Sequence, residues 1–223
     1  MARQKLVIVD EFYEEPDSIR QFALSLKYAQ KPKATYPGQE AIGTSVDWEP
    51  VRQVLREFIH EPVDGPCPKN PPFPQGKFRI AVARDEDTRV DGVHVDVQPW
   101  SAIVYLSRDE HCRGFGAVGL YRHKATGALE SSEEWQREVF GHLKQLPEDE
   151  AREKYWAYMR DKRNWEEVQR VEMVYNRALL LNAFFFHASI GVFGETPENG
   201  RLTQHFEYYY DRQEKSGMTT VET

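Results

Sequence analysis

The stretch GVHVDVQPWSAIVYLS (residues 92–107) decides how the rest of the sequence is interpreted. It places His94 and Asp96 one residue apart and then becomes largely apolar. Side chains alternate between the two faces of a β-strand, so residues 94 and 96 would point to the same side and could bind one ion. The triplet also suits a polar strand edge, with Asp96 forming a turn ahead of Pro99. This stretch alone leaves both interpretations open.

Short apolar segments bounded by Gly, Asp or Asn recur from Lys77 to Tyr210. We expect strands in KFRIAVA (77–83), VHVDV (93–97), SAIVYLS (101–107), AVGLYRH (117–123), RVEMVY (170–175), RALLLNAFFFHA (177–188) and RLTQHFEYYY (201–210). Many short strands separated by turn residues are typical of a sandwich or barrel. The predicted core is therefore an antiparallel jelly roll, or double-stranded β-helix, of seven or eight strands.

Helical patterns flank and interrupt this core. KLVIVDEF (5–12) predicts a strand, EPDSIRQFALSLKY (15–28) a helix with Pro16 in its first turn, and VDWEPVRQVLREFIH (46–60) a second helix. Residues 31–43 and the proline-rich 64–76 read as loops. Charged residues interspersed with Trp and Tyr at 128–165 indicate an insertion of two amphipathic helices. We therefore expect a single domain over residues 1–223 that is mainly β with flanking helices.

Composition narrows the classes of partner and compartment. A net charge of −7 and a pI near 5.6 argue against nucleic acid, because no basic stripe is present to displace phosphate counterions. The longest apolar run, ALLLNAFFFHA, is too short to span a bilayer, and the N-terminal apolar run is too short for a secretory signal. Two cysteines imply no disulfide framework. We expect a cytoplasmic protein without a membrane partner.

A second histidine strengthens the metal interpretation of the opening triplet. His187 is predicted to end the most apolar strand of the chain, where an imidazole without a partner would be poorly solvated. Two histidines and one carboxylate, with three coordination positions left open, suit non-haem Fe(II). His187 could instead be a core histidine bonded to a carbonyl, so the three residues support a metal only when taken together.

The last predicted strand carries polar residues on one face. In RLTQHFEYYY, period-two alternation places Arg201, Thr203, His205 and Glu207 on one side. A guanidinium inside a barrel needs a carboxylate, which either the protein or a dicarboxylate ligand could supply. Thr203 would bring a hydroxyl to the same carboxylate.

Taken in order, these motifs resemble the 2-oxoglutarate/Fe(II)-dependent oxygenase superfamily, and within it the prolyl-hydroxylase-like branch. The resemblance rests on His94-x-Asp96, IVYLS, GLYRH, NRALLLNAFFFHAS and Arg201-x-Thr203, and covers the chain outside 128–165. It implies that His94, Asp96 and His187 ligate Fe(II) and that Arg201 binds the distal carboxylate of 2-oxoglutarate. Tyr105 matches a tyrosine that reaches the same carboxylate in some relatives.

Two features depart from the branch, and one residue bears on the reaction. Arg201 follows His187 by a longer gap than usual, and the glycine pair of the second strand is present only loosely as GFGAVG. Iron halogenases of this fold carry a small residue where this chain has Asp96, so halogenation is not expected.

The resemblance implies an enzyme that converts 2-oxoglutarate and dioxygen to succinate and carbon dioxide while oxidising a substrate C–H bond. A small acidic chain favours a free metabolite, such as an amino acid or a natural-product precursor. A protein-directed hydroxylase and a non-catalytic metal-binding jelly-roll protein are the alternatives. The sequence leaves open the substrate, hydroxylation versus desaturation or cyclisation, and the oligomeric state.

Further residues could bind or enclose the substrate. His205, Arg79 and Arg122 fall in predicted strands and could bind a substrate carboxylate, although a solvated or salt-bridged role is the commoner fate of charged strand residues. Residues 128–165 are expected either to fold over the barrel mouth as a lid or to pack outside a sheet.

Overall fold

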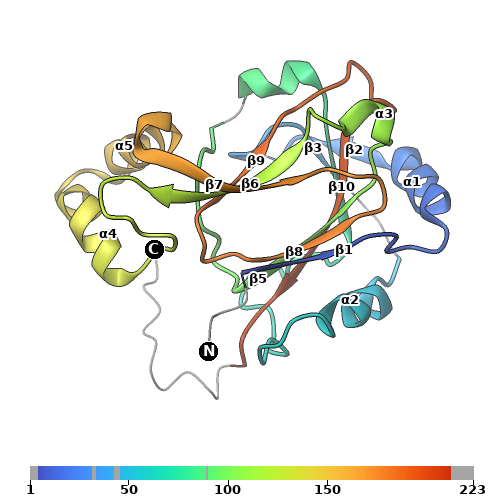
Figure 1. Ribbon diagram of the computed structural model, residues 1–223, viewed down its shortest axis with the longest axis horizontal. Helices are drawn as coiled ribbons and strands as arrows, with labels where there is room; N and C mark the ends of the chain where they lie inside the picture. The colour runs from blue at the N-terminus through green and yellow to red at the C-terminus, as the bar shows by residue number, and fades with distance from the viewer. Residues whose placement is uncertain (1–4, 32–33, 43–45, 89, 212–223) are drawn as a thin grey trace.

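The computed structural model describes residues 5–31, 34–42, 46–88 and 90–211 (Figure 1). Within these residues, seven strands form a large antiparallel sheet and three form a small one. The large sheet runs in the order β1 (Leu6–Val9), β8 (Ala178–Asn182), β5 (Trp100–Tyr105), β10 (Arg201–Tyr208), β4 (Lys77–Ala81), β3 (Gln39–Ile42) and β2 (Lys27–Ala29). The small sheet runs in the order β7 (Trp165–Glu172), β6 (Ala117–His123) and β9 (His187–Ile190).

The path of the chain between the sheets defines a jelly roll. From β4 onward, the chain passes to a bridge between His94 and His187 beside the small sheet, returns to β5, and enters β6 and β7. It then alternates through β8, β9 and β10, so that strands distant in sequence become neighbours in each sheet. This is the double wrapping expected of a double-stranded β-helix. The predicted fold class, mainly β with flanking helices around a jelly-roll core, is confirmed.

The apolar run at 177–188 is two strands, not the single strand predicted. β8 ends at Asn182, whose side-chain oxygen accepts a hydrogen bond from the Phe184 amide at 3.3 Å, and the chain turns there. The next strand, β9, begins at His187 in the other sheet. His187 therefore starts a strand instead of ending one, because a polar side chain within the run stabilises a turn.

Other local predictions also differ from the structure. The helix predicted over 15–28 ends at Ser25, and Lys27–Ala29 form β2. The strand predicted over 170–175 is shifted, because β7 runs from Trp165 to Glu172. Residues Gln39–Ile42, predicted as loop, form β3, which pairs with β4 through Glu40 and Arg79. The predicted strand at 93–97 contributes only the bridge from His94 to His187. Part of the predicted loop at 31–43, residues 32–33 and 43, lies outside the described residues.

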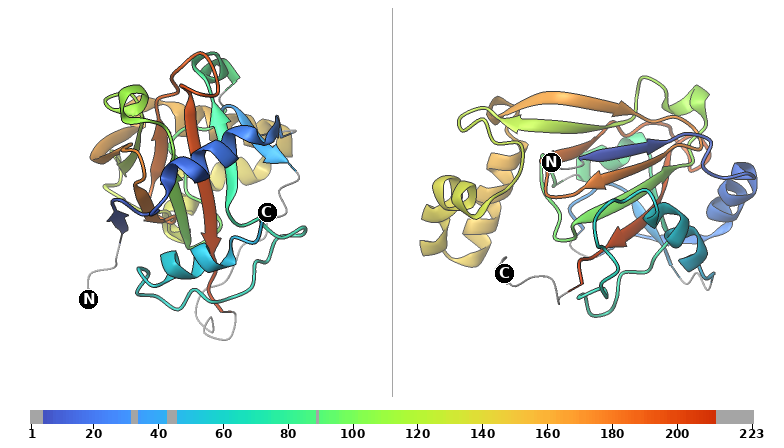
Figure 2. Two further views of the ribbon diagram at one scale, coloured as in Figure 1. Left: turned by 90° about the vertical axis from the view of Figure 1, so that its right-hand side faces the viewer. Right: turned by 60° about the horizontal axis from the view of Figure 1, so that its bottom comes forward.

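Two helices cover the outer face of the large sheet. α1 (Pro16–Ser25) and α2 (Glu49–Arg56) follow the pattern predicted for the N-terminal part, each with a proline in its first turn. Ala23 and Leu55, both fully buried, pack with Phe78, Leu202 and Phe206 from the sheet. In Figure 2, α1 lies across the strands of this sheet. The opposite face of the large sheet is thereby left to line the space between the sheets.

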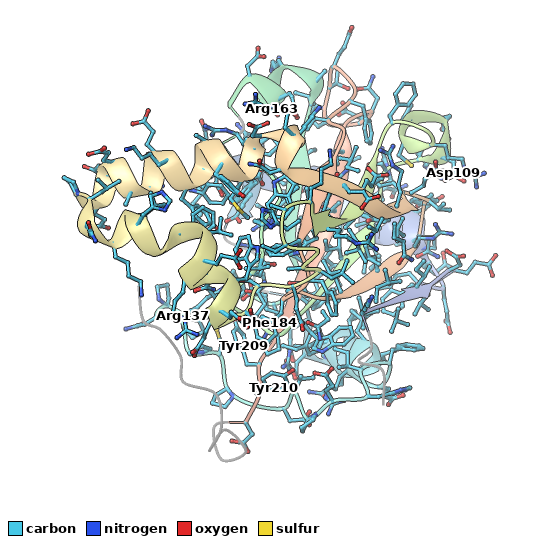
Figure 3. All side chains as sticks on the ribbon, turned by 60° about the vertical axis from the view of Figure 1, so that its left-hand side comes forward. Asp109, Arg137, Arg163, Phe184, Tyr209 and Tyr210 are labelled. Atoms are coloured by element: carbon cyan, nitrogen blue, oxygen red, sulfur yellow. The ribbon has the colours of Figure 1, made fainter. Side chains whose placement is uncertain are left out.

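A helical insertion separates β6 from β7. It contains α4 (Glu133–Phe140), a 3-10 turn, α5 (Glu148–Arg160) and a second 3-10 turn. Trp135, Trp165 and Phe186 form the centre of an aromatic cluster that joins these helices to the β core. The two helices lie together at one end of the barrel, with Arg137 and Arg163 on their outer side (Figure 3). A four-residue helix, α3 (Asp109–Cys112), and a 3-10 helix (Ala83–Thr88) complete the described elements.

Among the described residues, none of the helices combines the length and the apolar character that crossing a membrane requires.

Candidate metal centre and cavity

His94 and His187 face each other across an isolated antiparallel bridge. The amide of each residue donates to the carbonyl of the other, at 2.8 and 2.9 Å. This pairing places the two imidazole rings with centroids 4.5 Å apart. The small sheet therefore fixes one histidine through β9 and the other through the bridge.

Both rings are oriented by the same kind of contact. The Nδ1 atom of His94 donates to the carbonyl of Gly92 at 2.8 Å, and the Nδ1 atom of His187 donates to the carbonyl of Phe185 at 2.8 Å. A carbonyl can only accept, so the proton lies on Nδ1 and the lone pair on Nε2. An imidazole held in this way is prepared to ligate a metal through Nε2.

Asp96 lies opposite both free nitrogens. One of its carboxylate oxygens is 3.9 Å from His94 Nε2 and the other is 3.7 Å from His187 Nε2. A ligand atom from each of the three residues lies within 4.8 Å of the others. Gln98 donates to the carboxylate at 2.9 Å, and the Ser101 hydroxyl lies at 3.3 Å. The structure thus brings the three predicted ligand residues together, and Gln98 and Ser101 contact the Asp96 carboxylate from outside this group.

The electrostatics favour the ligating forms of His94 and Asp96. Burial and the nearby His187 lower the pKa of His94, which keeps that imidazole neutral. Burial alone would raise the pKa of Asp96, but the close approach of the two histidines and Arg79 holds it well below its ordinary value. Burial also opposes protonation of His187, but the Asp96 carboxylate raises its pKa overall. A neutral His94 and an ionised Asp96 are the donors that a divalent transition metal requires.

The loop before His94 is held from two sides. Val90 and Asp91 donate their amides to the carbonyl of Thr35 at 2.8 and 2.9 Å. The amide of Val93 donates to the carbonyl of Met159, at the end of α5, at 3.2 Å. Gly92 packs directly against this helix end, where an added Cβ would meet the Met159 oxygen at 2.6 Å. The insertion therefore positions the loop that carries a candidate ligand.

The three candidate ligands line a cavity of about 400 Å³ between the sheets. The predicted polar face of β10 points into it, with Arg201, Thr203, His205 and Glu207 all in its wall. Leu202 and Tyr208 instead join the core beneath α1 and α2, as the alternation predicted. The cavity is also lined by Thr35, Tyr36 and Pro37 from the N-terminal part, and by Trp156 from α5.

Arg201 is buried and held by main-chain groups. It donates to the carbonyls of Ile190 and Gly191 at 3.0 and 3.2 Å. Two residues along, the Thr203 hydroxyl lies 2.8 Å from His205 Nε2. Burial and the charges of Arg79, Lys77 and Arg201 set the pKa of His205 well below its ordinary value, so that imidazole is neutral. These contacts fix polar groups along the cavity wall.

The remaining residues singled out from the sequence take three positions. Tyr105 pairs in register with Thr203 and shares its face, but it lies deeper, among apolar side chains, and is not in the cavity wall. Its buried hydroxyl makes no hydrogen bond with any described residue, and burial raises its pKa to about 12. Arg122 is exposed, pairs with Glu166 at 3.2 Å and does not line the cavity. Arg79 does line it.

Sequence reasoning did not find the groups that orient Asp96. Gln98 and Ser101 hydrogen-bond each other at 2.8 Å and both approach the carboxylate. Their positions two and five residues after Asp96 were visible in the opening stretch, but only the turn at Pro99 brings them back to it. Tyr36 was likewise missed, because it reaches the cavity from a distant segment, whereas Trp156 belongs to the insertion for which a lid over the barrel mouth was one of two expectations.

A family profile described as a family of unknown function (DUF6445) matches residues 1–206. The chain belongs to this family. No curated protein matches the DUF6445 chain.

Solved structures similar to the DUF6445 chain include HygX from Streptomyces hygroscopicus with nickel and 2-oxoglutarate bound. HygX shares 13% identity over 92% of this chain and 83% of its own, with a TM-score of 0.48. TqaL, described as an Fe(II)/(alpha)ketoglutarate-dependent dioxygenase, shares 13% identity over 93% and 83%, with a TM-score of 0.43. OrfP, described as a non-heme iron oxygenase in complex with Fe, shares 11% identity over 92% and 82%, with a TM-score of 0.38. At these scores the likeness carries no functional assignment.

Proposed function

We propose that this protein is an Fe(II)/2-oxoglutarate-dependent oxygenase that oxidises a C–H bond of a small metabolite. The observation that supports this most directly is the grouping of His94, Asp96 and His187. Both imidazoles are tied through Nδ1 and present Nε2 toward one carboxylate. Two histidines and a carboxylate on one side of an ion are the ligand set of non-haem Fe(II) oxygenases.

The donor set fits the metal that it implies. His94, Asp96 and His187 would hold Fe(II), and the contacts from Gly92, Phe185 and Gln98 would keep the ligand atoms aimed at it. Bound together, iron and 2-oxoglutarate would supply the oxidising power for C–H bond cleavage, at the expense of dioxygen and with release of succinate and carbon dioxide.

Arg201 and Thr203 would bind the distal carboxylate of 2-oxoglutarate. Both lie in the wall of the cavity that the three candidate ligands share, and Arg201 is 9% exposed. A buried guanidinium held in place by main-chain carbonyls puts a fixed positive charge in the cavity wall, which suits a carboxylate. His205, neutral beside Thr203, would line the same part of the site without adding charge. The contact predicted between Tyr105 and the same carboxylate stays a prediction, and the Tyr105 side chain lies among apolar residues outside the cavity wall.

The order of the motifs and the strand–helix start support a place in the prolyl-hydroxylase-like branch of the superfamily. Water exclusion would fall to residues of the cavity wall such as Trp156 of α5 and the segment 35–37. A cavity of about 400 Å³ suits a small metabolite together with the co-substrate.

The test is purification without oxygen, addition of Fe(II) and 2-oxoglutarate, and measurement of succinate formed after exposure to dioxygen. Arg201→Gln removes the guanidinium fork at similar size, so the apparent KM for 2-oxoglutarate should rise at least roughly tenfold while iron binding is retained. Arg122→Gln, at an exposed arginine outside the cavity, is the matched control. An unchanged KM in Arg201→Gln would refute the assignment of Arg201, and the absence of any 2-oxoglutarate binding or turnover would refute the proposed function.

A further inference from the structure

A second arginine, Arg79, lines the cavity from β4 and is distinct from Arg201. It stands in register with Thr203 of β10 on one side and with Glu40 of β3 on the other. It lines the same cavity as His94, Asp96 and His187. Arg79 therefore borders the cavity from β4, which pairs with β10 on the side away from β5.

The cluster around Arg79 holds more positive than negative charge. Glu40 contacts both Lys77 at 2.5 Å and Arg79 at 3.2 Å. Lys77 is almost fully buried, and burial together with the charge of Arg79 lowers its pKa to about 8. The two cations hold the pKa of Glu40 at about 2 against the effect of burial, so this carboxylate is ionised. One carboxylate shared by two cations leaves a surplus of one positive charge near neutral pH.

Arg79 is also held in a fixed orientation. Its guanidinium stacks on the ring of Tyr36 with 3.9 Å between the guanidinium carbon and the ring centroid. Its Nε atom contacts Glu40, whereas its two terminal nitrogens donate no hydrogen bond to any described residue. The side chain is 28% exposed and lines the cavity. The Tyr36 hydroxyl is buried near Arg79 and Glu40 but makes no hydrogen bond of good geometry with a described residue.

The other cation on this side of the cavity is already neutralised. Both carboxylate oxygens of Glu207 contact the Lys69 ammonium, at 2.9 and 2.6 Å. Apolar side chains complete the surroundings. Val95 and Val97, which flank Asp96, and Trp156 line the cavity, and Val97 is 78% exposed. An exposed valine beside a candidate metal ligand is a surface that an apolar ligand group would cover.

We propose that Arg79, together with Tyr36, binds the carboxylate of the substrate that the enzyme oxidises. We further propose that this substrate is a small carboxylic acid with an apolar body. This inference rests on the proposed function and adds the substrate class to it. The terminal nitrogens of Arg79 form the two-pronged donor that a carboxylate fits, and the Tyr36 hydroxyl offers a further donor. The apolar body then lies along Val95, Val97 and Trp156, next to the metal ligands.

The experiment measures binding, by isothermal titration calorimetry under argon, of N-acetyl derivatives of valine, leucine, isoleucine, methionine and phenylalanine. Each acid is compared with its C-terminal primary amide, which differs in little but the charge. The protein is titrated with Fe(II) and 2-oxoglutarate bound, and again without either. Arg79→Gln removes the charge and Arg79→Lys keeps the charge without the fork, while Arg122→Gln is the control at an exposed arginine. Lys77 continues to pair with Glu40 in all three variants.

We expect at least one acid to bind about tenfold more tightly than its amide. That preference should be lost in Arg79→Gln, weakened in Arg79→Lys and unchanged in Arg122→Gln. Equal binding of acids and amides, no acid binding up to millimolar concentration, or full affinity in Arg79→Gln would each overturn the inference. If Fe(II) and 2-oxoglutarate fail to bind, the proposed function fails, and the titration of the protein without them still decides the role of Arg79.

Discussion

His187 and His123 are buried to a similar degree, but they differ in how their two ring nitrogens are used. His187, at the start of β9, uses Nδ1 on the carbonyl of Phe185 and presents Nε2 to Asp96. His123, at the end of β6, uses both nitrogens on side chains of the insertion. Trp135 donates its indole N–H to Nδ1 at 3.1 Å, and Nε2 lies 2.6 Å from the Tyr158 hydroxyl. A buried histidine is a ligand candidate only where the protein leaves one nitrogen for something else.

The same contrast separates the surroundings of the two histidines. At the candidate metal site, main-chain carbonyls orient the rings of His94 and His187, so the ring positions follow from strand pairing. At the end of β6, the imidazole of His123 joins an aromatic cluster with Trp135 and Trp165, at centroid distances of 5.5 and 5.3 Å. The residues around His187 are arranged to bind a metal, whereas those around His123 pack into an aromatic core.

The largest expected effect is that of replacing His187 with alanine. His187→Ala should abolish turnover and reduce iron occupancy by at least about a hundredfold, because one of three ligands is lost. The metal-free protein should keep its fold, since the bridge between residues 94 and 187 uses only main-chain atoms. Iron content by elemental analysis and unfolding in urea would measure the two effects.

His123→Ala should give the reverse result. It removes three hydrogen bonds, with Thr126, Trp135 and Tyr158, and the ring contacts of a packed cluster, so the free energy of unfolding should fall by about 2–4 kcal/mol. Iron occupancy at saturating metal should stay near that of the unaltered protein. His142→Ala, at an exposed position, is the control for both. Loss of iron in His123→Ala with stability unchanged would break the distinction between the two settings.

A second, smaller effect is expected at the junction between the regions. Gly92→Ala would place a Cβ 2.6 Å from the carbonyl oxygen of Met159 and 2.7 Å from the Cα of Arg160. Both are backbone atoms, so the loop must shift, and the carbonyl that orients His94 shifts with it. We expect iron affinity to fall by about 10–100-fold, the range for lost outer contacts. Gly127→Ala, which has open space but a positive φ of 73°, controls for a general effect of replacing glycine. Unchanged iron affinity in Gly92→Ala would show that α5 does not position the ligand loop.

Particular residues show why some of this could be predicted from the sequence. β6 was predicted with the observed ends, Ala117 and His123, because its alternation and its flanking turn residues are local. His94, Asp96 and His187 could be grouped because period-two alternation puts residues 94 and 96 on one face and because the order of the three residues resembles a known ligand motif. The two amphipathic helices between β6 and β7 were likewise evident from their pattern.

The rest depends on contacts that no local pattern contains. β3 is a strand because Glu40 lies beside Arg79 of β4, a partner distant in sequence. Residues 178–186 are apolar except for Asn182, and only the turn that Asn182 stabilises divides this run between two sheets. Tertiary packing alone buries Tyr105 among apolar side chains and stacks Tyr36 on Arg79.

A weaker effect should appear in the pH dependence of stability. Burial lowers the pKa of His123 below its ordinary value of 6.5, so the unfolded chain binds a proton more readily than the folded one. The contribution of this histidine to stability is therefore present above that value and is lost as pH falls through the folded pKa. Protonation would also remove the acceptor for the Trp135 indole.

The measurement is urea unfolding at several pH values between 5 and 8, compared between the unaltered protein and His123→Phe. Part of the stability lost on acidification should disappear in the variant, and His94 and His205, whose pKa values are also lowered, contribute to the loss that remains. An identical pH dependence in the two proteins would mean that His123 is protonated equally in both states.

The smallest effect is expected for movement of the insertion. The C-terminal end of α5 is fixed to the ligand loop by the bonds from Val93 to Met159 and from Arg160 to Val90, the latter at 2.8 Å. Its first turn, Glu148–Glu150, is exposed and acidic. Opening should therefore be confined to the stretch Pro147–Glu153, at the end of α5 farther from these anchors. Limited proteolysis there should slow by only about two- to threefold when an N-acetyl amino acid that binds joins Fe(II) and 2-oxoglutarate, because ordering lowers the population of the open form. Cleavage outside this stretch serves as the internal control. Equal rates at Pro147–Glu153 with and without the acid would leave the insertion as a fixed wall, with Trp156 held at the cavity by packing alone.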